Sequence, residues 1–377
     1  MNNTHTPSRT LRRPPTASHQ GEVTCCAFAP GQTWAVSGGW DGQVVQWDRA
    51  TGEQITSWRA GDKPVTACAV APDGRRVVTG SMDGLLAEWD VTTQRRLSLF
   101  LAHTRPISAI VFAPDGQHFA TSSWDRSIIL WAAGRDRTNK TMAGHQDIVA
   151  GCRFTPDGRE LVSWSYDGTL RRWETARACQ LACWTAHPDR VTAGDVSPDG
   201  RWFASGSRDG SVALWDRATN QEVARQTAGP HEIRGCFFSP DAELLFAVPA
   251  QGEILTYRVP ELASHTGQET GLAVQCASLL PTGEQLALGT DEGRLEFITL
   301  DAMADRPICV TAVETHEDRP GFLARLLGRQ QFQRVFRCTC PICARLFELK
   351  STDRRTAVCP ACKRQLHVNQ FTLFAPR

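Results

Sequence analysis

A tryptophan recurs every 42 residues along much of this chain, and this repeat constrains the fold more than any other feature. The repeated residues are Trp47, Trp89, Trp131, Trp173 and Trp215, and the series continues with Tyr257 and, after a step of 41, Ile298. A proline keeps the same register, in most copies within a Pro-Asp-Gly turn, at Pro30, Pro72, Pro114, Pro156, Pro198, Pro240 and Pro281. Two independent markers therefore predict seven copies of one structural unit.

Each copy contains only strand and turn signals. Short apolar runs such as Val65 to Val70, Arg76 to Thr79 and Leu85 to Trp89 are separated by turn pairs such as Asp83-Gly84. Four short antiparallel strands form a sheet that cannot bury both of its faces alone. Seven such sheets packed radially bury one another, so an all-β, seven-bladed propeller is predicted.

The motifs within the copies resemble those of the WD-repeat (WD40) family over roughly residues 19–315. Gly144-His145 stands at the start of a copy, Tyr166-Asp167-Gly168 at a turn, and Trp-Asp pairs such as Trp89-Asp90 at the end of a strand. The resemblance implies the seven-bladed WD40 β-propeller fold.

In that family a His, a Ser or Thr, an Asp and a Trp form a hydrogen-bonded tetrad within a blade, which satisfies buried polar groups. Four copies carry this set: His19, Ser37, Asp41, Trp47; His103, Thr121, Asp125, Trp131; His145, Ser163, Asp167, Trp173; and His187, Ser205, Asp209, Trp215. The second copy has Gly61 in place of the histidine, and the last two copies lack the set. We read these residues as structural, because a catalytic triad would occur once and not at a fixed period.

The strand that closes the ring has two candidates. The seventh copy could use its own strand near Arg306 to Val313, or the stretch from Leu11 to Ser18 could supply it, as is usual in the family. Pro14-Pro15 suits an edge strand poorly, so the sequence favours the C-terminal strand.

Two matched Cys-x-x-Cys pairs follow the propeller, at Cys340/Cys343 and Cys359/Cys362. Their spacing resembles the zinc-ribbon family and predicts one structural Zn²⁺ held by these four thiolates, with a β-hairpin after each pair. A redox dithiol is the alternative, and Cys338 and His367 are weaker ligand candidates.

The segment from Gly321 to Val335 is predicted to form a basic amphipathic helix between the two domains. The expected organisation is a flexible basic segment at 1–18, a propeller at 19–316, a linker helix at 317–336 and a zinc ribbon at 337–377.

The motifs in the sequence favour an interaction protein over an enzyme. No phosphate loop, paired-carboxylate cleft or nucleophile motif is present, and function on a propeller is carried by its loops. The residue before each tetrad Asp should point onto one rim, where large side chains suit partner binding: Trp40, Met82, Trp124, Tyr166 and Arg208. These side chains could instead cover neighbouring loops.

We therefore expect a non-catalytic protein–protein scaffold without membrane partners or a small-molecule substrate. The alternative is a nucleic-acid- or ribosome-associated factor, because residues 320–377 hold eleven Lys and Arg against Glu348 and Asp353. Fourteen cysteines without an export signal predict a cytoplasmic protein with reduced thiols.

Overall fold

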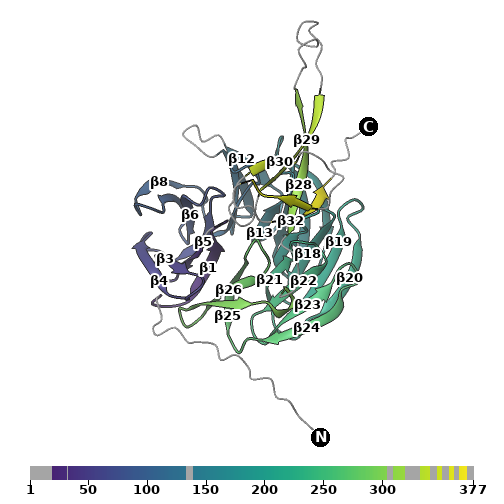
Figure 1. Ribbon diagram of the computed structural model, residues 1–377. Helices are drawn as coiled ribbons and strands as arrows, with labels where there is room; N and C mark the ends of the chain where they lie inside the picture. Colours follow the sequence, from purple (N-terminus) through teal and green to yellow (C-terminus); the bar gives the residue numbers. More distant parts are fainter. Residues whose placement is uncertain are drawn as a thin grey trace, which may run out of the picture.

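The computed structural model shows a ring of seven β-sheets followed by a separate five-stranded sheet, which is here called the second sheet (Figure 1). It describes residues 19–31, 33–132, 139–303, 309–318, 332–339, 346–349, 356–360 and 365–371. One short 3-10 helix, Asp301–Met303, follows the last sheet of the ring. The predicted segment 1–18 lies outside the described residues.

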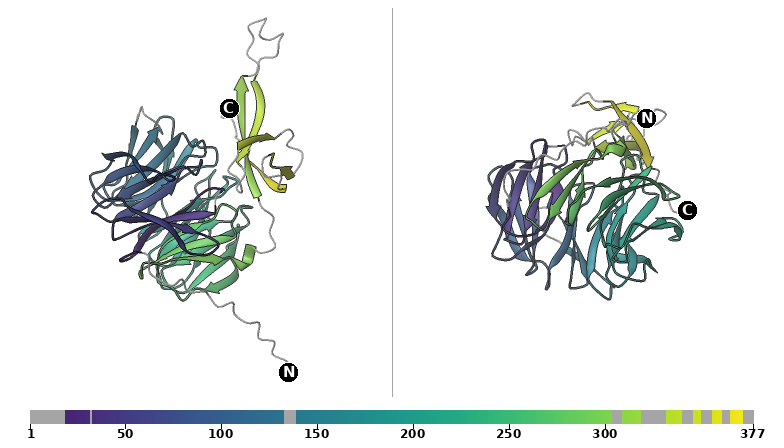
Figure 2. Two further views of the ribbon diagram at one scale, coloured as in Figure 1. Left: turned by 60° about the vertical axis from the view of Figure 1, so that its left-hand side comes forward. Right: turned by 90° about the horizontal axis from the view of Figure 1, so that it is seen from below.

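Each repeat forms one blade, and the blades are numbered 1 to 7 along the chain (Figure 2). The innermost strands are β1 (Val23–Phe28), β5 (Val65–Val70), β9 (Ile107–Phe112), β13 (Val149–Phe154), β17 (Val191–Val196), β21 (Ile233–Phe238) and β25 (Val274–Leu279). The second strands are β2 (Trp34–Gly39), β6 (Arg76–Ser81), β10 (His118–Ser123), β14 (Glu160–Ser165), β18 (Trp202–Ser207), β22 (Leu244–Pro249) and β26 (Gln285–Thr290).

The third and fourth strands lie toward the outside of the ring. The third strands are β3 (Gln43–Asp48), β7 (Leu85–Asp90), β11 (Ser127–Ala132), β15 (Thr169–Glu174), β19 (Ser211–Asp216), β23 (Glu253–Arg258) and β27 (Leu295–Thr299). The outermost strands are β4 (Gln54–Arg59), β8 (Arg96–Leu101), β12 (Asn139–Ala143), β16 (Cys179–Thr185), β20 (Glu222–Thr227) and β24 (Ala263–Glu269). Every neighbouring pair within a blade is antiparallel, so the seven-bladed all-β propeller is confirmed.

The core lies between blades. Each innermost strand begins with a valine or isoleucine that is almost fully buried, such as Val23 and Ile107. One apolar cluster joins Val36 and Trp34 of blade 1 to Val65 and Val77 of blade 2. Because each blade covers the apolar face of the next, the ring is stable only as a stack of neighbours.

A ladder of hydroxyl groups also ties neighbouring blades together. The second residue of an innermost strand donates to the carbonyl of the first residue in the next blade. These bonds run from Thr24 to Val65, Thr66 to Ile107 (2.6 Å), Ser108 to Val149 (2.5 Å) and Thr192 to Ile233 (2.7 Å). The same position holds Ala150, Arg234 and Gln275 in the other blades, so the ladder is interrupted there.

The predicted closing strand near Arg306 to Val313 is wrong. The strand β28 (Cys309–Asp318) pairs with β29 and β32 in the second sheet, so both of its edges are occupied away from blade 7. Blade 7 has three strands within the described residues. The backbone N–H of His19 donates to the carbonyl of Gly293 in blade 7 over 3.2 Å. The other candidate, Leu11 to Ser18, lies outside the described residues.

The second sheet has the order β30-β29-β28-β32-β31. Its other strands are β29 (Phe332–Thr339), β30 (Leu346–Leu349), β31 (Thr356–Val358) and β32 (Gln365–Phe371). The expected helix at 317–336 is therefore wrong at both ends, because residues 317–318 and 332–336 are in paired strands. The helix was predicted from apolar residues at a spacing of four, Phe322 with Leu326 and Leu323 with Leu327, and these residues lie outside the described ones. The unit after the propeller begins at β28, before the expected boundary at 316.

Candidate binding site at the mouth of the central channel

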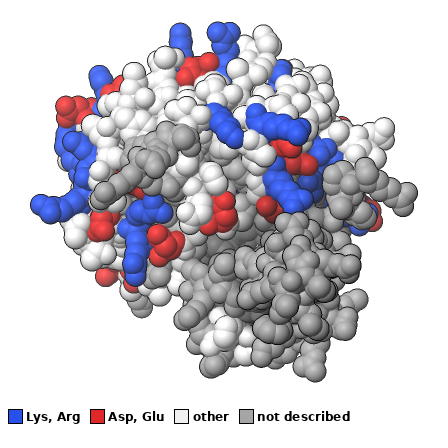
Figure 3. Space-filling model, turned by 90° about the horizontal axis from the view of Figure 1, so that it is seen from above, with Lys and Arg blue, Asp and Glu red and all other residues white. Residues whose placement is uncertain are grey.

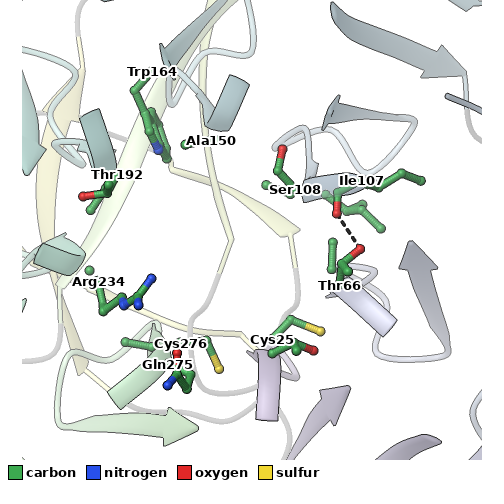
Figure 4. Close-up of a pocket in the computed structure, with 18 of the residues that line it drawn as sticks. Cys25, Thr66, Ile107, Ser108, Ala150, Trp164, Thr192, Arg234, Gln275 and Cys276 are labelled. Carbon is green, nitrogen blue, oxygen red and sulfur yellow. Dashed lines mark hydrogen bonds between the residues drawn. The ribbon is translucent and has the colours of Figure 1, made fainter. Parts of the chain in front are cut away.

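The seven innermost strands surround a hollow of about 530 Å³ along the axis of the ring. Figure 4 shows that their second residues, among them Thr66, Ser108, Ala150, Thr192, Arg234 and Gln275, lie around it. Four of these seven second residues carry hydroxyl groups that already bond to the next blade. Two of the other three offer the guanidinium of Arg234 and the amide of Gln275.

Four of the five predicted rim residues line this hollow: Trp40, Met82, Trp124 and Tyr166. Each stands at the turn between the second and third strands of its blade. Trp40 is 51% exposed and Trp124 is 41% exposed, although both rings are large and apolar. Arg208 is exposed but is not among the residues that line the hollow.

Tyr166 differs from the two tryptophans because a neighbour covers it. The guanidinium of Arg190 lies 4.9 Å from the centre of its ring, and burial raises the pKa of its hydroxyl. Its ring thus packs on a neighbouring loop, as the alternative interpretation of the rim residues expects. Trp40 and Trp124 remain the exposed aromatic side chains of the mouth.

The charged groups near the mouth have mixed signs. Glu22, Glu232 and Arg234 line the hollow, and Arg234 lies 3.5 Å from Glu232. On the face shown in Figure 3, basic and acidic side chains lie next to one another around the described part of the ring. This face therefore carries no uniform basic field of the kind that attracts a polyanion.

Trp164 is a channel residue that the sequence analysis missed. It occupies a strand position that holds glycine in four other blades, at Gly38, Gly80, Gly206 and Gly289. Its indole fits because Gly151 and Gly194 are next to it: a Cβ atom on either would approach the ring to 2.5 or 2.7 Å. Its buried Nε1–H has no hydrogen-bond partner among the described residues. Reading the repeat column by column would have revealed this exchange of a glycine for a tryptophan.

Three tetrads have a common geometry. In blade 3, Nδ1 of His103 lies 2.9 Å from Asp125, Nε2 lies 2.7 Å from Thr121, and Nε1–H of Trp131 donates to Thr121 over 3.0 Å. The carboxylate only accepts, so the network assigns the proton to Nδ1. The same bonds, of 2.8 to 3.0 Å, join His19, Asp41, Ser37 and Trp47 in blade 1 and His145, Asp167, Ser163 and Trp173 in blade 4.

The fourth predicted tetrad, in blade 5, is different. Nδ1 of His187 accepts from Arg225 over 2.9 Å and lies 2.8 Å from Ser211, while the Asp209 carboxylate accepts from Ser211 over 2.6 Å. No hydrogen bond between His187 and Asp209 is present in the described structure. The expected His–Asp contact is thus replaced by an arginine contact. The equivalent positions in other blades hold Ser57, Leu99, Thr141, Cys183 and Gly267, so Arg225 is peculiar to blade 5.

Acid should destabilise the protein through His187. Burial, and next the charge of Arg225, lower the pKa of His187 to about 4. The unfolded chain then binds a proton near pH 6.5 that the folded chain does not bind until about pH 4. The contribution of His187 to the free energy of unfolding is therefore fully present above pH 6.5. It falls by up to about 3 kcal/mol as the pH drops to 4. Urea unfolding at pH 7.5 and pH 5 measures this loss.

The variant Arg225→Gln removes one cause of the shift and should make the pH dependence shallower. Arg208→Gln, which changes an exposed arginine of the same blade, is the matched control and should keep the slope of the unmodified chain. Equal slopes for the two variants would show that Arg225 does not act on His187.

Asp125 and Asp167 do not contribute to this pH dependence. Burial raises the pKa of each carboxyl, but hydrogen bonds lower it by more, so the net pKa is lowered. A lowered carboxyl pKa affects stability only below about pH 4.

Each of the two cysteine pairs lies in the chain between two strands of the second sheet. Cys340 and Cys343 fall between β29 and β30, and Cys359 and Cys362 between β31 and β32, so strands flank each pair on both sides. Arg337 of β29 pairs with Val313 in antiparallel register, and His367 of β32 pairs with Cys309 in parallel register. The C-terminal end of β29 and the N-terminal end of β32 therefore lie at the same end of the sheet, on either side of the start of β28.

Cys359 is fully buried at the end of β31. The other three predicted ligands, Cys340, Cys343 and Cys362, lie outside the described residues. The backbone of Cys338 belongs to β29, but its side chain is not among the described ones. Within the described residues, no group of three or more potential metal ligands is present.

The sequence model of the family described as "WD domain, G-beta repeat" matches residues 7–48, 52–90, 94–132, 136–174 and 178–216. These five matches cover more than half of the chain. No curated protein shows significant similarity to the chain. Among the described residues, no helix has the length and apolar character needed to cross a membrane.

Proposed function

Because the chain belongs to the WD40 repeat family, whose propellers generally act as interaction scaffolds, we propose that it is a non-catalytic scaffold that binds another protein at the channel mouth. The observation that supports this proposal is the exposure of Trp40 and Trp124, at 51% and 41%, beside a hollow of about 530 Å³. Large aromatic side chains left exposed on a rigid rim are typical anchors of protein interfaces.

The rim also has the physical properties of a binding surface. Backbone hydrogen bonds fix its turns: Trp40 N–H donates to Glu22 O over 2.9 Å, and Trp124 N–H donates to Pro106 O over 3.0 Å. Little conformational entropy is therefore lost when a partner covers these rings. Met82 between them adds an adaptable apolar contact. Arg208, exposed and outside the hollow, is a contact at the edge of the same interface.

Replacing Trp40, Trp124 and Tyr166 together by alanine should weaken partner binding by at least roughly 30-fold, since even one exposed aromatic anchor, such as Trp40 or Trp124, contributes about 2 kcal/mol. Proteins captured by the intact chain are identified first, and the affinity of the main partner is then measured for both forms. The triple variant Ile55→Ala, Leu97→Ala, Leu181→Ala is the control, because these exposed apolar residues lie on the outermost strands β4, β8 and β16.

Equal affinity of the rim variant and the control for the same partner would rule out the mouth as the binding site. Nuclease treatment before capture separates direct protein binding from binding through nucleic acid. If the captured proteins are lost after nuclease treatment, the basic C-terminal residues and not the rim carry the interaction.

A zinc ribbon is proposed as a second interaction module. Its support is the topology of the second sheet, which places the chain ends adjoining both cysteine pairs at one end of the sheet, roughly 10 Å apart across β28. The complete burial of Cys359 agrees with a thiolate that faces a metal and not solvent. Four thiolates from Cys340, Cys343, Cys359 and Cys362 would leave no open position on Zn²⁺, so its role would be structural.

A further inference from the structure

Two cysteine side chains meet where the first and last blades of the ring come together. Cys26 lies on β1 and Cys276 on β25, and their sulfur atoms are 3.7 Å apart. The thiol of Cys276 is also 3.5 Å from the carbonyl oxygen of Val23, and that of Cys26 is 3.6 Å from the carbonyl oxygen of Ala287. Both residues are partly buried and line the central hollow.

This seam is one of the three seams that lack the hydroxyl bond of the ladder. At four seams, a hydroxyl group donates to the carbonyl of the first residue in the next blade. Here Gln275 holds that position, and the thiol of the following residue, Cys276, contacts the carbonyl of Val23, although a thiol is a much weaker donor. Blade 7 also has no tetrad, and its sheet has three strands within the described residues. The two blades are 250 residues apart in the chain, so no short connection holds them together.

We propose that Cys26 and Cys276 form a reversible disulfide that locks the ring between blade 7 and blade 1. A disulfide requires the sulfur atoms to approach to about 2.05 Å, which is less than 2 Å closer than their present separation. The oxidant is a small-molecule disulfide of the glutathione type, which reaches the pair from the hollow. The proposal concerns the closure of the ring and does not depend on partner binding at the mouth.

The reaction is two successive thiol–disulfide exchanges. The thiolate of Cys26 attacks one sulfur of the small disulfide, forms a mixed disulfide and releases one small thiolate. Cys276 then loses its proton and attacks the Cys26 sulfur, which expels the second small thiolate. Two protein thiols are oxidised by two electrons, the small disulfide is reduced by two, and the two protons end on the released thiols.

The order of attack follows from the hydrogen bond between the two groups. Cys276 donates its thiol proton toward the sulfur of Cys26 and is therefore the protonated member of the pair. The same bond and burial raise the pKa of the Cys276 thiol, so it stays protonated until the mixed disulfide is formed beside it. Cys25 and Cys68, at the seam between blades 1 and 2, are both buried and also line the hollow, so the peptide map must distinguish a cross-link between them from one between Cys26 and Cys276.

The lock is tested on the full-length, zinc-saturated chain carrying Cys179→Ser and Cys183→Ser, because these two thiols are exposed on β16. The folded protein is treated with oxidised glutathione, remaining thiols are alkylated, and peptides are mapped without reduction. We expect a cross-linked pair of peptides containing Cys26 and Cys276, which dithiothreitol reverses. The oxidised ring should melt roughly 5 to 10 °C higher, since the cross-link closes a very long loop.

Cys26→Ser and Cys276→Ser should each abolish both the cross-link and the rise in melting temperature. Cys25→Ser is the matched control on the same strand and should keep both. Glutathione that remains attached to Cys26 without a cross-link would overturn the proposal. A cross-link that forms only in urea would also overturn it, because the pair would then not be preformed in the folded ring.

Discussion

Changing Cys343 and Cys362 to serine is expected to reduce the zinc content of the purified chain from about one atom to none and to unfold the sheet of β28 to β32. Small domains with little apolar core commonly need a metal in order to fold, and a structural Zn²⁺ contributes on the order of 10 kcal/mol to folding. Elemental analysis measures the metal. Limited proteolysis measures the sheet, which should be cut rapidly while the propeller stays intact.

The matched control for this prediction is Cys338→Ser. Cys338 is a thiol two residues before the first cysteine pair, on β29, and the proposed ligand set does not include it. This variant should keep its zinc and its resistance to protease. Retention of zinc by the Cys343/Cys362 double variant would show that other residues bind the metal, and an unmodified chain without zinc would disprove the ribbon.

Asp125→Ala should destabilise the propeller by about 2 to 3 kcal/mol, and Asp209→Ala by about 1 kcal/mol or less. The Asp125 carboxylate accepts from His103 Nδ1–H and from the backbone N–H groups of Thr104 and Ser127. Its removal leaves these donors without an acceptor in a mostly buried site, whereas Asp209 does not hold His187 in place. The larger loss corresponds to a fall of roughly 5 °C in melting temperature.

Asp167→Ala is a second test of the same reasoning, because Asp167 bonds to His145 and to the backbone of Gln146 and Thr169. Calorimetry of the three variants should place Asp125→Ala and Asp167→Ala together, well below Asp209→Ala. Three equal melting temperatures would mean that the contact between His and Asp contributes nothing measurable, and that the tetrads are held by their His–Ser and Ser–Trp bonds alone.

The repeat in the sequence was sufficient to predict the blades because it fixes local structure. The spacing of Trp47 and its counterparts sets the third strand of a blade, and strand pairing within a blade involves residues close in sequence. The positions of Trp40 and Trp124 follow from the same register, since a turn residue keeps its place from copy to copy. These features depend on one repeated unit and not on the whole ring.

The features that were not predicted depend on contacts between distant segments. Whether β28 joins blade 7 or the second sheet depends on a competition between two long-range pairings, which composition cannot decide. The approach of Cys26 to Cys276 exists only after the ring closes. Arg225 belongs to an outermost strand, and only the folded blade shows that its guanidinium reaches His187. Trp164, in contrast, could have been found as an exception to a column of glycines.

The unequal ladder of hydroxyl groups has a mechanical consequence for the ring. Blades 1 to 4 are joined in succession by Thr24, Thr66 and Ser108, whereas no hydroxyl bond of this series leads into or out of blade 7. Thermal fluctuations open a structure first where its links are weakest, and repeat proteins open in groups of neighbouring units. Blade 7 is thus the compliant element of the ring. We expect its strands to exchange amide hydrogens faster than the strands of blades 1 to 4, because none of these hydroxyl bonds joins it to a neighbour.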